Sequence, residues 1–326
     1  MEIPDRYRDL SVLGYPLNLG DLEKREAWPQ ADVYPPPGFI QGITLFEVGN
    51  GDTSGFYWPI GGENQEPILC DIYHDEWSLQ PQASSLEGLV RLKVAEGYCE
   101  PGDDNYQAAQ ELAAQLRFTL PDADGSEPLP AGLQLALDPD SPAVLKSAAQ
   151  GAMKSGDLEV AAGHLRLALD LLPEYTEALI LLGHLYRRQG KLPEAAQKLT
   201  EAMGAPVCFG WEREKALLSV KRLRDGDYPE LASDPLWSQR QQLTFATGVK
   251  RNDDFNIYEE AVAEYLRQGK GVLAVRLRVL VGELMWRETT SFRERYGYSM
   301  EKHRQLLRGE IEQAGLTDRL IVCGAA

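Results

Sequence analysis

The sequence predicts an α+β N-terminal domain, an antiparallel sheet with flanking helices, followed by an all-α domain of helical repeats. The first observation is a group of aromatic and β-branched runs between residues 43 and 73, separated by Gly, Asn and Pro, as is typical of strands. The second is a set of small and apolar residues that recur at a fixed interval between residues 156 and 202. Apolar residues beyond this region keep a helical spacing.

Three or more strands are expected in the N-terminal domain. They include Ile43–Val48, Gly55–Ile60 and Pro67–Tyr73. The connector Gly61–Glu66 contains glycines that can take a positive φ, which predicts an antiparallel hairpin between the second and third of these strands. The Gly-Asn-Gly-Asp turn signal at residues 49–52 ends the first one.

A capped amphipathic helix is expected to close over the sheet. Ser84 and Ser85 supply the cap, and Glu87 lies in the first turn. The apolar residues that follow are spaced for one helix face: Leu86, Leu89, Val90 and Leu92. The first 126 residues are therefore predicted to be α+β.

The second half of the chain carries an internal repeat. Four residues recur after 34 positions, which is the tetratricopeptide period; Gly156, Ala161, Leu165 and Ala168 return as Gly190, Ala195, Leu199 and Ala202. Small residues at these sites allow the two helices of a repeat to approach closely, and the glycine turns the chain between them. Ser141 and Pro142 supply a cap and a first-turn proline where the array begins. The sequence thus predicts tetratricopeptide-like repeats.

Further helices are expected beyond Gly204, where the match to the repeat fades. Their ranges are Trp211–Leu223, Leu236–Thr247, Ile257–Gln268, Val272–Arg287 and Met300–Ala314. Tyr265, Gly269 and Ala274 have the offsets of Tyr186, Gly190 and Ala195, which indicates a degenerate repeat. We expect these helices to extend and close the array, with a separate helical bundle as the alternative.

These patterns divide the chain into an acidic α+β domain at residues 1–120, a linker at 121–141 and a helical repeat domain at 142–326. The clear repeats occupy 142–175 and 176–209. The linker is rich in Pro, Gly, Asp and Ser. Because Leu133–Leu137 inside it is apolar, part of the linker is expected to dock as a strand or turn.

Composition indicates an ordinary globular protein, with 43% hydrophobic and 25% charged residues. The first residues carry acids and lack the apolar segment of a signal peptide, and no stretch of apolar residues is long enough for a membrane span. We therefore expect a cytoplasmic protein. The cysteines, Cys70, Cys99, Cys208 and Cys323, lack CxxC spacing, which favours reduced structural thiols over a zinc site.

The net charge of −17 is concentrated in the N-terminal part. Residues 1–126 hold 22 Asp and Glu against 7 Lys and Arg, whereas the rest of the chain holds 28 against 26. Such a field repels nucleic acid and anionic lipid and attracts basic partners. The alternative is that the acidic surface serves solubility alone. We expect no nucleic-acid partner and no membrane partner.

No catalytic constellation is recognised, and a non-enzymatic protein without a cofactor or bound metal is expected. His74, with Asp75 and Glu76 beside it, is the best candidate base or metal ligand. Adjacent residues point in different directions, however, and no second His or Cys lies nearby in the sequence. Phosphate-binding loops and nucleophile elbows are absent from the sequence. A metal-dependent hydrolase centred on His74 is a remote alternative.

The N-terminal residues resemble a known family. The sequence IPDRYRD at Ile3–Asp9 is followed by a Gly/Asn turn before an aromatic strand, a PILCD strand and a serine-rich cap into a helix. In this order they resemble the SUKH superfamily, also known for a cell-wall synthesis regulator, over roughly residues 1–95. The resemblance implies an intracellular interaction module or a bacterial immunity protein that neutralises a polymorphic toxin.

On this hypothesis the acidic domain covers the active site of a basic, nuclease-type toxin. Aromatic side chains supply buried anchors and carboxylates supply steering. The expected contact residues are Asp52, Tyr57, Trp58, Asp71, His74, Asp75, Glu76 and Trp77. Because side chains alternate along a strand, about half of them are expected to be core.

A tetratricopeptide adaptor that captures a partner peptide or helix in a concave groove is the main alternative. The expected groove residues are Lys146, Gln150, Met153, Glu177, Ile180, His184, Arg187 and Arg188. They do not reproduce the Lys/Asn clamp of chaperone adaptors. Loss of binding in an Asp75→Lys/Glu76→Lys variant would favour the acidic domain, and loss in an Arg187→Glu/Arg188→Glu variant would favour the groove.

Overall fold

The structure is a computed structural model. It describes residues 4–8, 10, 39–43, 53–72, 79–98, 101–102, 104–122, 129–207, 209–223, 225–243, 254–286 and 289–323. The chain forms two compact units: unit 1 comprises Met1–Lys24, Phe39–Pro59 and Asn64–Pro173, and unit 2 comprises Arg25–Gly38, Ile60–Glu63 and Glu174–Ala326. This division does not follow the expected boundaries at residues 120 and 142, because the first pair of repeat helices belongs to unit 1.

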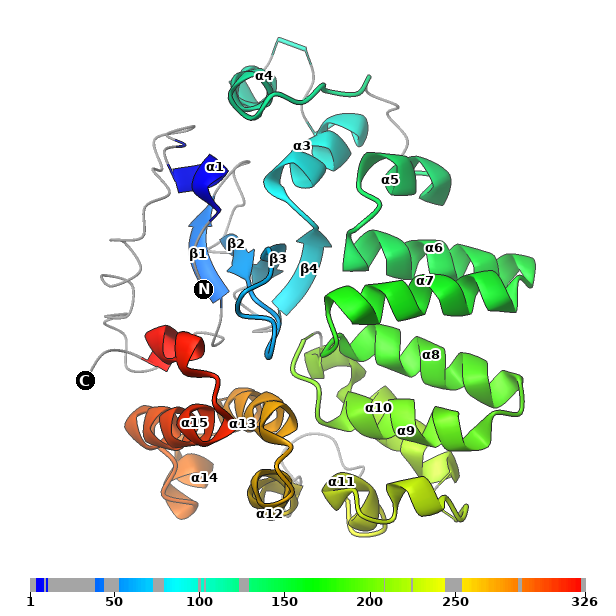
Figure 1. The fold of residues 1–326 in the computed structure, drawn as a ribbon, viewed down its shortest axis with the longest axis vertical. Helices are drawn as coiled ribbons and strands as arrows, with labels where there is room; N and C mark the ends of the chain where they lie inside the picture. The colour runs from blue at the N-terminus through cyan, green and yellow to red at the C-terminus, as the bar shows by residue number, and fades with distance from the viewer. Residues whose placement is uncertain are drawn as a thin grey trace. The chain divides into compact units, whose positions relative to one another are not determined.

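Unit 1 combines a small antiparallel sheet with helices (Figure 1). Its described elements in chain order are α1 (Asp5–Arg8), β1 (Phe39–Ile43), β2 (Thr53–Tyr57), β3 (Ile68–Ile72), β4 (Leu79–Ala83), α3 (Leu86–Ala95), α4 (Asp104–Leu116), α5 (Ala131–Leu137), α6 (Pro142–Ser155) and α7 (Leu158–Leu171). The predicted α+β character of the N-terminal part is confirmed at this level.

The sheet has the order β1-β2-β3-β4, and each neighbouring pair is antiparallel. The predicted hairpin is confirmed, with Phe56 of β2 opposite Leu69 of β3. β2 ends at Tyr57, before Pro59, which has no backbone N–H to donate to a ladder. Of the expected strand Ile43–Val48, only its first residue lies in β1, and residues 44–48 lie outside the described part of the chain.

Strand β4 was not predicted from the sequence. Its sequence, LQPQA, contains Pro81, and a proline argues against a central strand. The order of the described strands places β4 at an edge of the sheet, where a missing N–H is tolerated. Leu79, Pro81 and Ala83 are the buried positions of an alternating pattern, which is the signal that could have revealed the strand.

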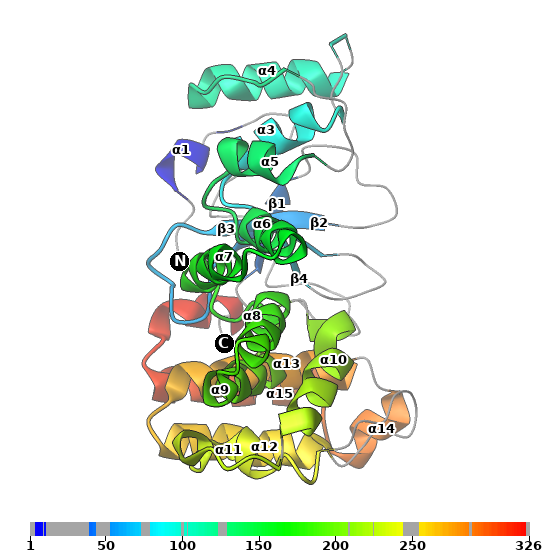
Figure 2. The same ribbon diagram turned by 90° about the vertical axis from the view of Figure 1, so that its right-hand side faces the viewer.

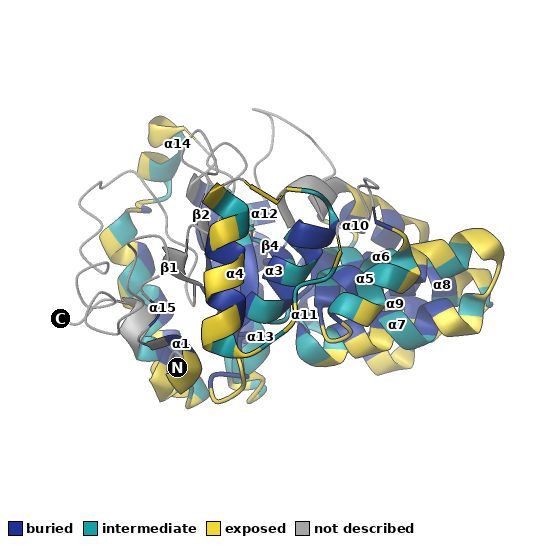
Figure 3. Cartoon of the chain, turned by 90° about the horizontal axis from the view of Figure 1, so that it is seen from above, coloured by how far each residue is buried: buried dark blue, intermediate teal, exposed yellow. Residues whose placement is uncertain are grey.

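The core of unit 1 lies between the sheet and its helices. Tyr7 stacks on Phe56 with 5.4 Å between the ring centroids, and Trp58 is fully buried beside them. The predicted cap of α3 is confirmed, since the Ser85 hydroxyl accepts a hydrogen bond of 3.0 Å from the backbone N–H of Gly88. Helix α4 buries one face and exposes the other (Figure 3).

The expected linker contains a helix, α5, where a strand or turn was predicted. A short apolar run does not distinguish the period of a strand from that of a helix. In the structure, Leu133, Leu135 and Leu137 pack against the core of unit 1 from a helix. Asp138 follows the helix and accepts hydrogen bonds from the backbone N–H of Ser84, at 2.9 Å, and from its hydroxyl. This end of the linker is therefore an integral part of unit 1.

Apart from the short segment Ile60–Glu63, the described residues of unit 2 are mostly helical. Its described elements are α8 (Thr176–Arg188), α9 (Leu192–Met203), α10 (Phe209–Leu223), η3 (Pro229–Leu231), α11 (Pro235–Ser238), α12 (Asp254–Arg267), α13 (Gly271–Trp286), α14 (Thr290–Arg295), α15 (Met300–Ala314) and η5 (Thr317–Cys323). None of the described helices is both long and apolar enough to cross a membrane.

The 34-residue repeat corresponds to two helical hairpins, α6–α7 in unit 1 and α8–α9 in unit 2. Gly156 and Gly190 turn the chain at equivalent places, with φ of 91° and 76°. At Gly269, the glycine of the degenerate repeat, φ is 72°. In each case the next backbone N–H bonds a carbonyl of the preceding helix, as in the 2.9 Å bond from Lys191 to Tyr186. This left-handed turn favours glycine over other residues.

Gly183 allows α8 and α9 to approach closely. A Cβ atom at this position would lie 2.7 Å from Cγ of Leu199, which is too short for a non-bonded contact. The small residue required by the repeat is therefore explained by packing between the two helices.

The Gly183→Ala substitution is expected to lower the free energy of unfolding by about 1–3 kcal/mol through overpacking. Gly163→Ala is the matched control, because Gly163 also lies within a helix but has open space where the Cβ would be placed. It is expected to raise stability by roughly 0.5–1 kcal/mol through helix propensity. Urea denaturation followed by circular dichroism would measure both, and changes of the same sign would contradict this packing argument.

Most later helices match the prediction closely, and one does not. Met300–Ala314 forms α15, and α10, α12 and α13 agree within three residues at each end. The expected helix Leu236–Thr247 was wrong in its described part, since α11 ends at Ser238 and turns follow to Gln242. The apolar spacing there comes from Leu236, Trp237 and Leu243, which are buried without belonging to one helix.

Candidate protein-binding face on helices α8 and α10

The contact residues expected in the acidic domain are only partly described. Asp52 and the run His74, Asp75, Glu76 and Trp77 lie outside the described residues. Of the other three, Tyr57 and Trp58 are buried and Asp71 is half-buried on β3. Trp58 lies with Phe56 in the core cluster of unit 1, and Tyr57, its neighbour in the chain, is buried as well. Neither ring offers a surface to a partner.

The expected groove residues belong to different parts of the fold. Lys146, Gln150 and Met153 lie on α6 in unit 1, whereas Glu177, Ile180, His184, Arg187 and Arg188 lie on α8 in unit 2. Ile180 is buried, while both arginines are exposed. Within unit 2, the groove prediction therefore reduces to residues of α8.

Helix α10 adds residues to this part of α8. It packs against both α8 and α9, as Figures 1 and 2 show. His184 on α8 is half-buried, and its Nε2 atom lies 2.7 Å from the hydroxyl oxygen of Ser219 on α10. This half-buried hydrogen bond links α8 to α10. Gly183, next to His184, has no side chain and so lets α8 pack close to α9.

Exposed cations surround the His184–Ser219 pair. Burial lowers the pKa of His184, and the positive charges of Arg187, Arg222 and Lys215 lower it further. All three cations are exposed, and within the described part of the chain neither Arg187 nor Arg222 forms an ion pair with a carboxylate. The site therefore has a positive potential in a chain whose net charge is −17.

An exposed leucine lies on the same face. Lys215, Leu218, Ser219 and Arg222 are spaced i, i+3, i+4 and i+7 on α10, so they share one side of the helix. Leu218 is 47% exposed. We call the set His184, Arg187, Lys215, Leu218, Ser219 and Arg222 the α8–α10 basic face. Sequence reasoning found two of its members, and the cationic spacing on α10 was the signal for the others.

The other described histidines, His164 and His303, lie outside this face. The His303 Nδ1 atom lies 2.6 Å from the hydroxyl of Tyr298, and burial lowers the pKa of His303 to about 3, so the ring is neutral near pH 7. His164 is half-buried on α7. No group of three or more His, Cys, Asp or Glu side chains that could hold a metal ion occurs among the described residues.

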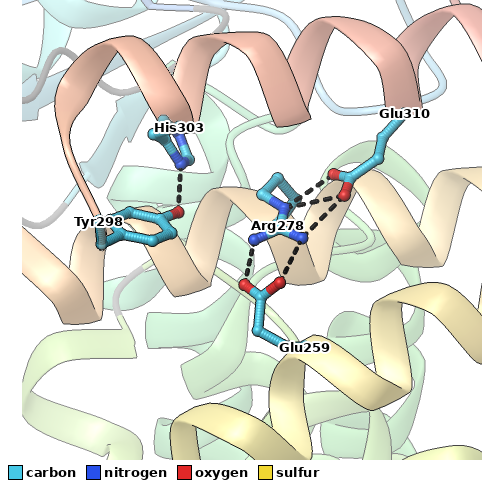
Figure 4. A network of polar contacts seen from close by, with 5 residues as sticks. All are labelled: Glu259, Arg278, Tyr298, His303 and Glu310. Atoms are coloured by element: carbon cyan, nitrogen blue, oxygen red, sulfur yellow. Dashed lines mark hydrogen bonds and ion pairs between the residues drawn. The ribbon is translucent and has the colours of Figure 1, made fainter. Parts of the chain in front are cut away.

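A buried ionic network joins three helices of unit 2 (Figure 4). Arg278 on α13 donates hydrogen bonds to Glu310 on α15, at 2.8 to 3.0 Å, and to Glu259 on α12. Burial alone would lower the pKa of Arg278, but these bonds hold it above its ordinary value. Burial also raises the pKa of Glu310, against the effect of Arg278. Because Arg278 binds one carboxylate from each of two neighbouring helices, the network ties α12, α13 and α15 together.

Comparison with known proteins places the chain in a family. The model of the YfbP N-terminal domain matches residues 25–104, and that of the YfbP C-terminal domain matches residues 245–314. A protein of Escherichia coli (strain K12), named "Uncharacterized protein YfbP", is 31% identical over 279 residues, covering 84% of this chain and 87% of that protein. The chain belongs to the YfbP family. In the sequence, the residues of the α8–α10 basic face fall after the first matched range and before the second.

Membership in the YfbP family corrects the resemblance stated above. The N-terminal part matches the YfbP N-terminal domain and not SUKH, so the SUKH prediction was wrong. The features behind it included the IPDRYRD segment, a Gly/Asn turn, two strands and a serine cap, and turns, strands and caps are dictated by local backbone chemistry. Such features occur in unrelated α+β folds, and they did not identify the YfbP family.

Proposed function

We propose that the chain is a non-enzymatic protein-binding protein that holds an acidic segment of a partner on the α8–α10 basic face. A cytoplasmic location belongs to the same proposal. The observation that supports it most is the arrangement of Arg187, Arg222 and Lys215 around the half-buried His184–Ser219 pair. Exposed cations concentrated on one face of an acidic protein attract anionic groups.

Carboxylates of a partner segment would meet the cations from two helices at once. Arg187 and Arg222 can each bind a carboxylate through two parallel hydrogen bonds. Leu218 lies between Lys215 and Arg222 on α10 and offers an apolar contact that an ion alone would not use. The expected ligand is therefore an acidic peptide segment that also carries an apolar side chain.

Neutralisation of a toxin remains a prediction, now without its family basis. The acidity of residues 1–126 still favours a basic partner for that part of the chain. That charge does not distinguish a toxin from other basic proteins. A tetratricopeptide-like scaffold agrees with both the 34-residue repeat and the helical hairpins, and it supports the adaptor proposal more directly.

Binding of a fluorescein-labelled peptide of glutamates flanking a leucine would test the basic face. The Arg187→Glu/Arg222→Glu variant is expected to bind it at least about tenfold more weakly, because two attractive contacts become repulsive. The affinity of the unchanged protein should also fall as salt is raised from about 0.05 to 0.5 M. Fluorescence anisotropy measures both effects.

The Lys154→Glu/Arg166→Glu variant is the matched control, since both residues are exposed and the change in net charge is the same. It is expected to bind the peptide like the unchanged protein. Equal losses in the two variants would mean that only net charge matters, which would refute a specific face. Pull-down from a lysate with mass spectrometry, repeated with Asp75→Lys/Glu76→Lys, would reveal whether a natural partner uses the acidic domain instead.

A further inference from the structure

One short segment of unit 2 comes from a distant part of the sequence. Ile60–Glu63 lies between β2 and β3 in the chain, yet it belongs to unit 2. The Ile60 side chain is 1% exposed. It lies in an apolar cluster formed by α13 and α15, which comprises Val275, Val279, Leu307 and Ile311. An isoleucine buried in such a cluster gains most of the free energy of transfer from water to an apolar environment, and this holds the segment in place.

Both polar groups of the Ile60 backbone are bound by side chains of unit 2. The Ile60 N–H donates to Oε1 of Glu174 at 2.6 Å, and Nη2 of Arg276 donates to the Ile60 carbonyl oxygen at 2.9 Å. The same Nη2 atom lies 3.3 Å from Oε2 of Glu174, so the two side chains hold each other in place. The Glu174 carboxylate thus binds the backbone donor of Ile60, and the Arg276 guanidinium binds its backbone acceptor.

The residues after Ile60 are recognised as well. The Glu63 carboxylate accepts a hydrogen bond of 2.6 Å from Nε of Arg319, whose side chain is fully buried. Gly61 has φ of 92°, and a Cβ atom there would lie 3.2 Å from both methyl groups of Val272. Unit 2 therefore requires a particular kind of residue at three positions of the segment: an apolar residue, a glycine and an acid.

We propose that unit 2 carries a peptide-recognition site for a segment of the form Ile-Gly-Gly-Glu. Residues 60–63 of the chain occupy this site, which we call the Ile60 site; its polar residues are Glu174, Arg276 and Arg319. A free peptide of the same chemistry enters when the internal segment leaves. The Ile60 site is distinct from the α8–α10 basic face and takes a different ligand.

The internal segment competes strongly because it is tethered. Chain connectivity gives it an effective concentration in the millimolar range, so a peptide at micromolar concentration cannot displace it. Weakening the internal segment, without touching the residues that line the site, removes this competition. Ile60→Ser with Glu63→Gln does so, since the first substitution removes the apolar anchor and the second removes the charge that pairs with Arg319.

The test measures binding of a fluorescein-labelled peptide, WPIGGENQ, to the full chain by anisotropy. The Ile60→Ser/Glu63→Gln variant is expected to bind the peptide at least about tenfold more tightly than the unchanged protein does. Asn64→Ser/Gln65→Ser is the control, because both residues are exposed in the same connector, and it should behave like the unchanged protein. The Gly61→Val form of the peptide is expected not to bind.

Hydrogen exchange on the unchanged protein provides a second measurement that does not depend on a variant. Adding about 1 mM WPIGGENQ should speed deuterium uptake in fragments containing Ile60, whose N–H is bonded to Glu174. Absence of binding by a variant that retains its helical circular dichroism would overturn the proposal. If the variant does not fold, unchanged deuterium uptake in the unchanged protein would overturn it instead.

Discussion

The Arg278→Met substitution is expected to lower the free energy of unfolding by about 3–5 kcal/mol, because it leaves two carboxylates without their shared cation. The Arg278 side chain is only 2% exposed, and it bonds Glu310 and Glu259 at the same time. Methionine fills a similar volume, so the loss reports the missing charge and hydrogen bonds rather than a cavity. Urea denaturation followed by far-ultraviolet circular dichroism measures it.

Two further variants separate the charge from the packing. Glu310→Gln removes one of the two acids but keeps Arg278 paired with Glu259, so it is expected to cost less than about 1.5 kcal/mol. Replacing all three residues with apolar ones, as Glu259→Leu/Arg278→Met/Glu310→Leu, is expected to restore most of the stability lost in Arg278→Met, since no buried charge remains. A triple variant no more stable than Arg278→Met would show that packing, and not the uncompensated charge, causes the loss.

The local features of the fold were predictable from sequence because nearby residues determine them. The cap at Ser85 acts on a backbone N–H three residues away, and Gly190 sets the turn in which it lies. Gly183 and Leu199, which pack against each other, likewise lie within one repeat. Such features need no knowledge of how distant segments meet.

Contacts between distant residues were not predictable in the same way. Arg278 and Glu310 are 32 positions apart, and Glu63 and Arg319 are 256 apart. A charged residue at any of these positions is more often exposed, and no spacing in the sequence marks it as buried. Ile60 shows the same limit, because its aromatic and β-branched neighbours predicted the end of a strand, while its own side chain and backbone are bound within unit 2.

The candidate site was recovered in part for the same reason. His184 and Arg187 were identified from the helical repeat, whose phase is local. Their neighbours on α10 required the packing of α10 against α8, which lies outside the clear repeat. The uneven distribution of charge along the chain, by contrast, predicted a contact surface in the acidic N-terminal part. Two of the residues expected there, Tyr57 and Trp58, are buried.

The Arg319→Met substitution is expected to cost about 3–5 kcal/mol near pH 7, because the carboxylate of Glu63 then lies buried without its cation. In the unchanged protein burial would raise the pKa of Glu63, but the Arg319 charge and the Gly61 N–H hold it below its ordinary value. This group therefore stabilises the fold above its unfolded pKa of about 4.3, and the stabilisation is lost as pH falls through the lower folded pKa.

Without Arg319 the sign of this dependence reverses. Burial then raises the pKa of Glu63 above its unfolded value, so the penalty is greatest at neutral pH and disappears as protonation removes the charge. The stability difference between the unchanged protein and Arg319→Met should accordingly narrow as pH is lowered from about 7 to 4. In Glu63→Gln/Arg319→Met position 63 carries no carboxylate, so the pH dependence that Glu63 causes is expected to be absent. Urea denaturation at several pH values measures the free energy of unfolding of all three proteins. A stability difference between the unchanged protein and Arg319→Met that does not change with pH would show that Arg319 does not stabilise the Glu63 carboxylate.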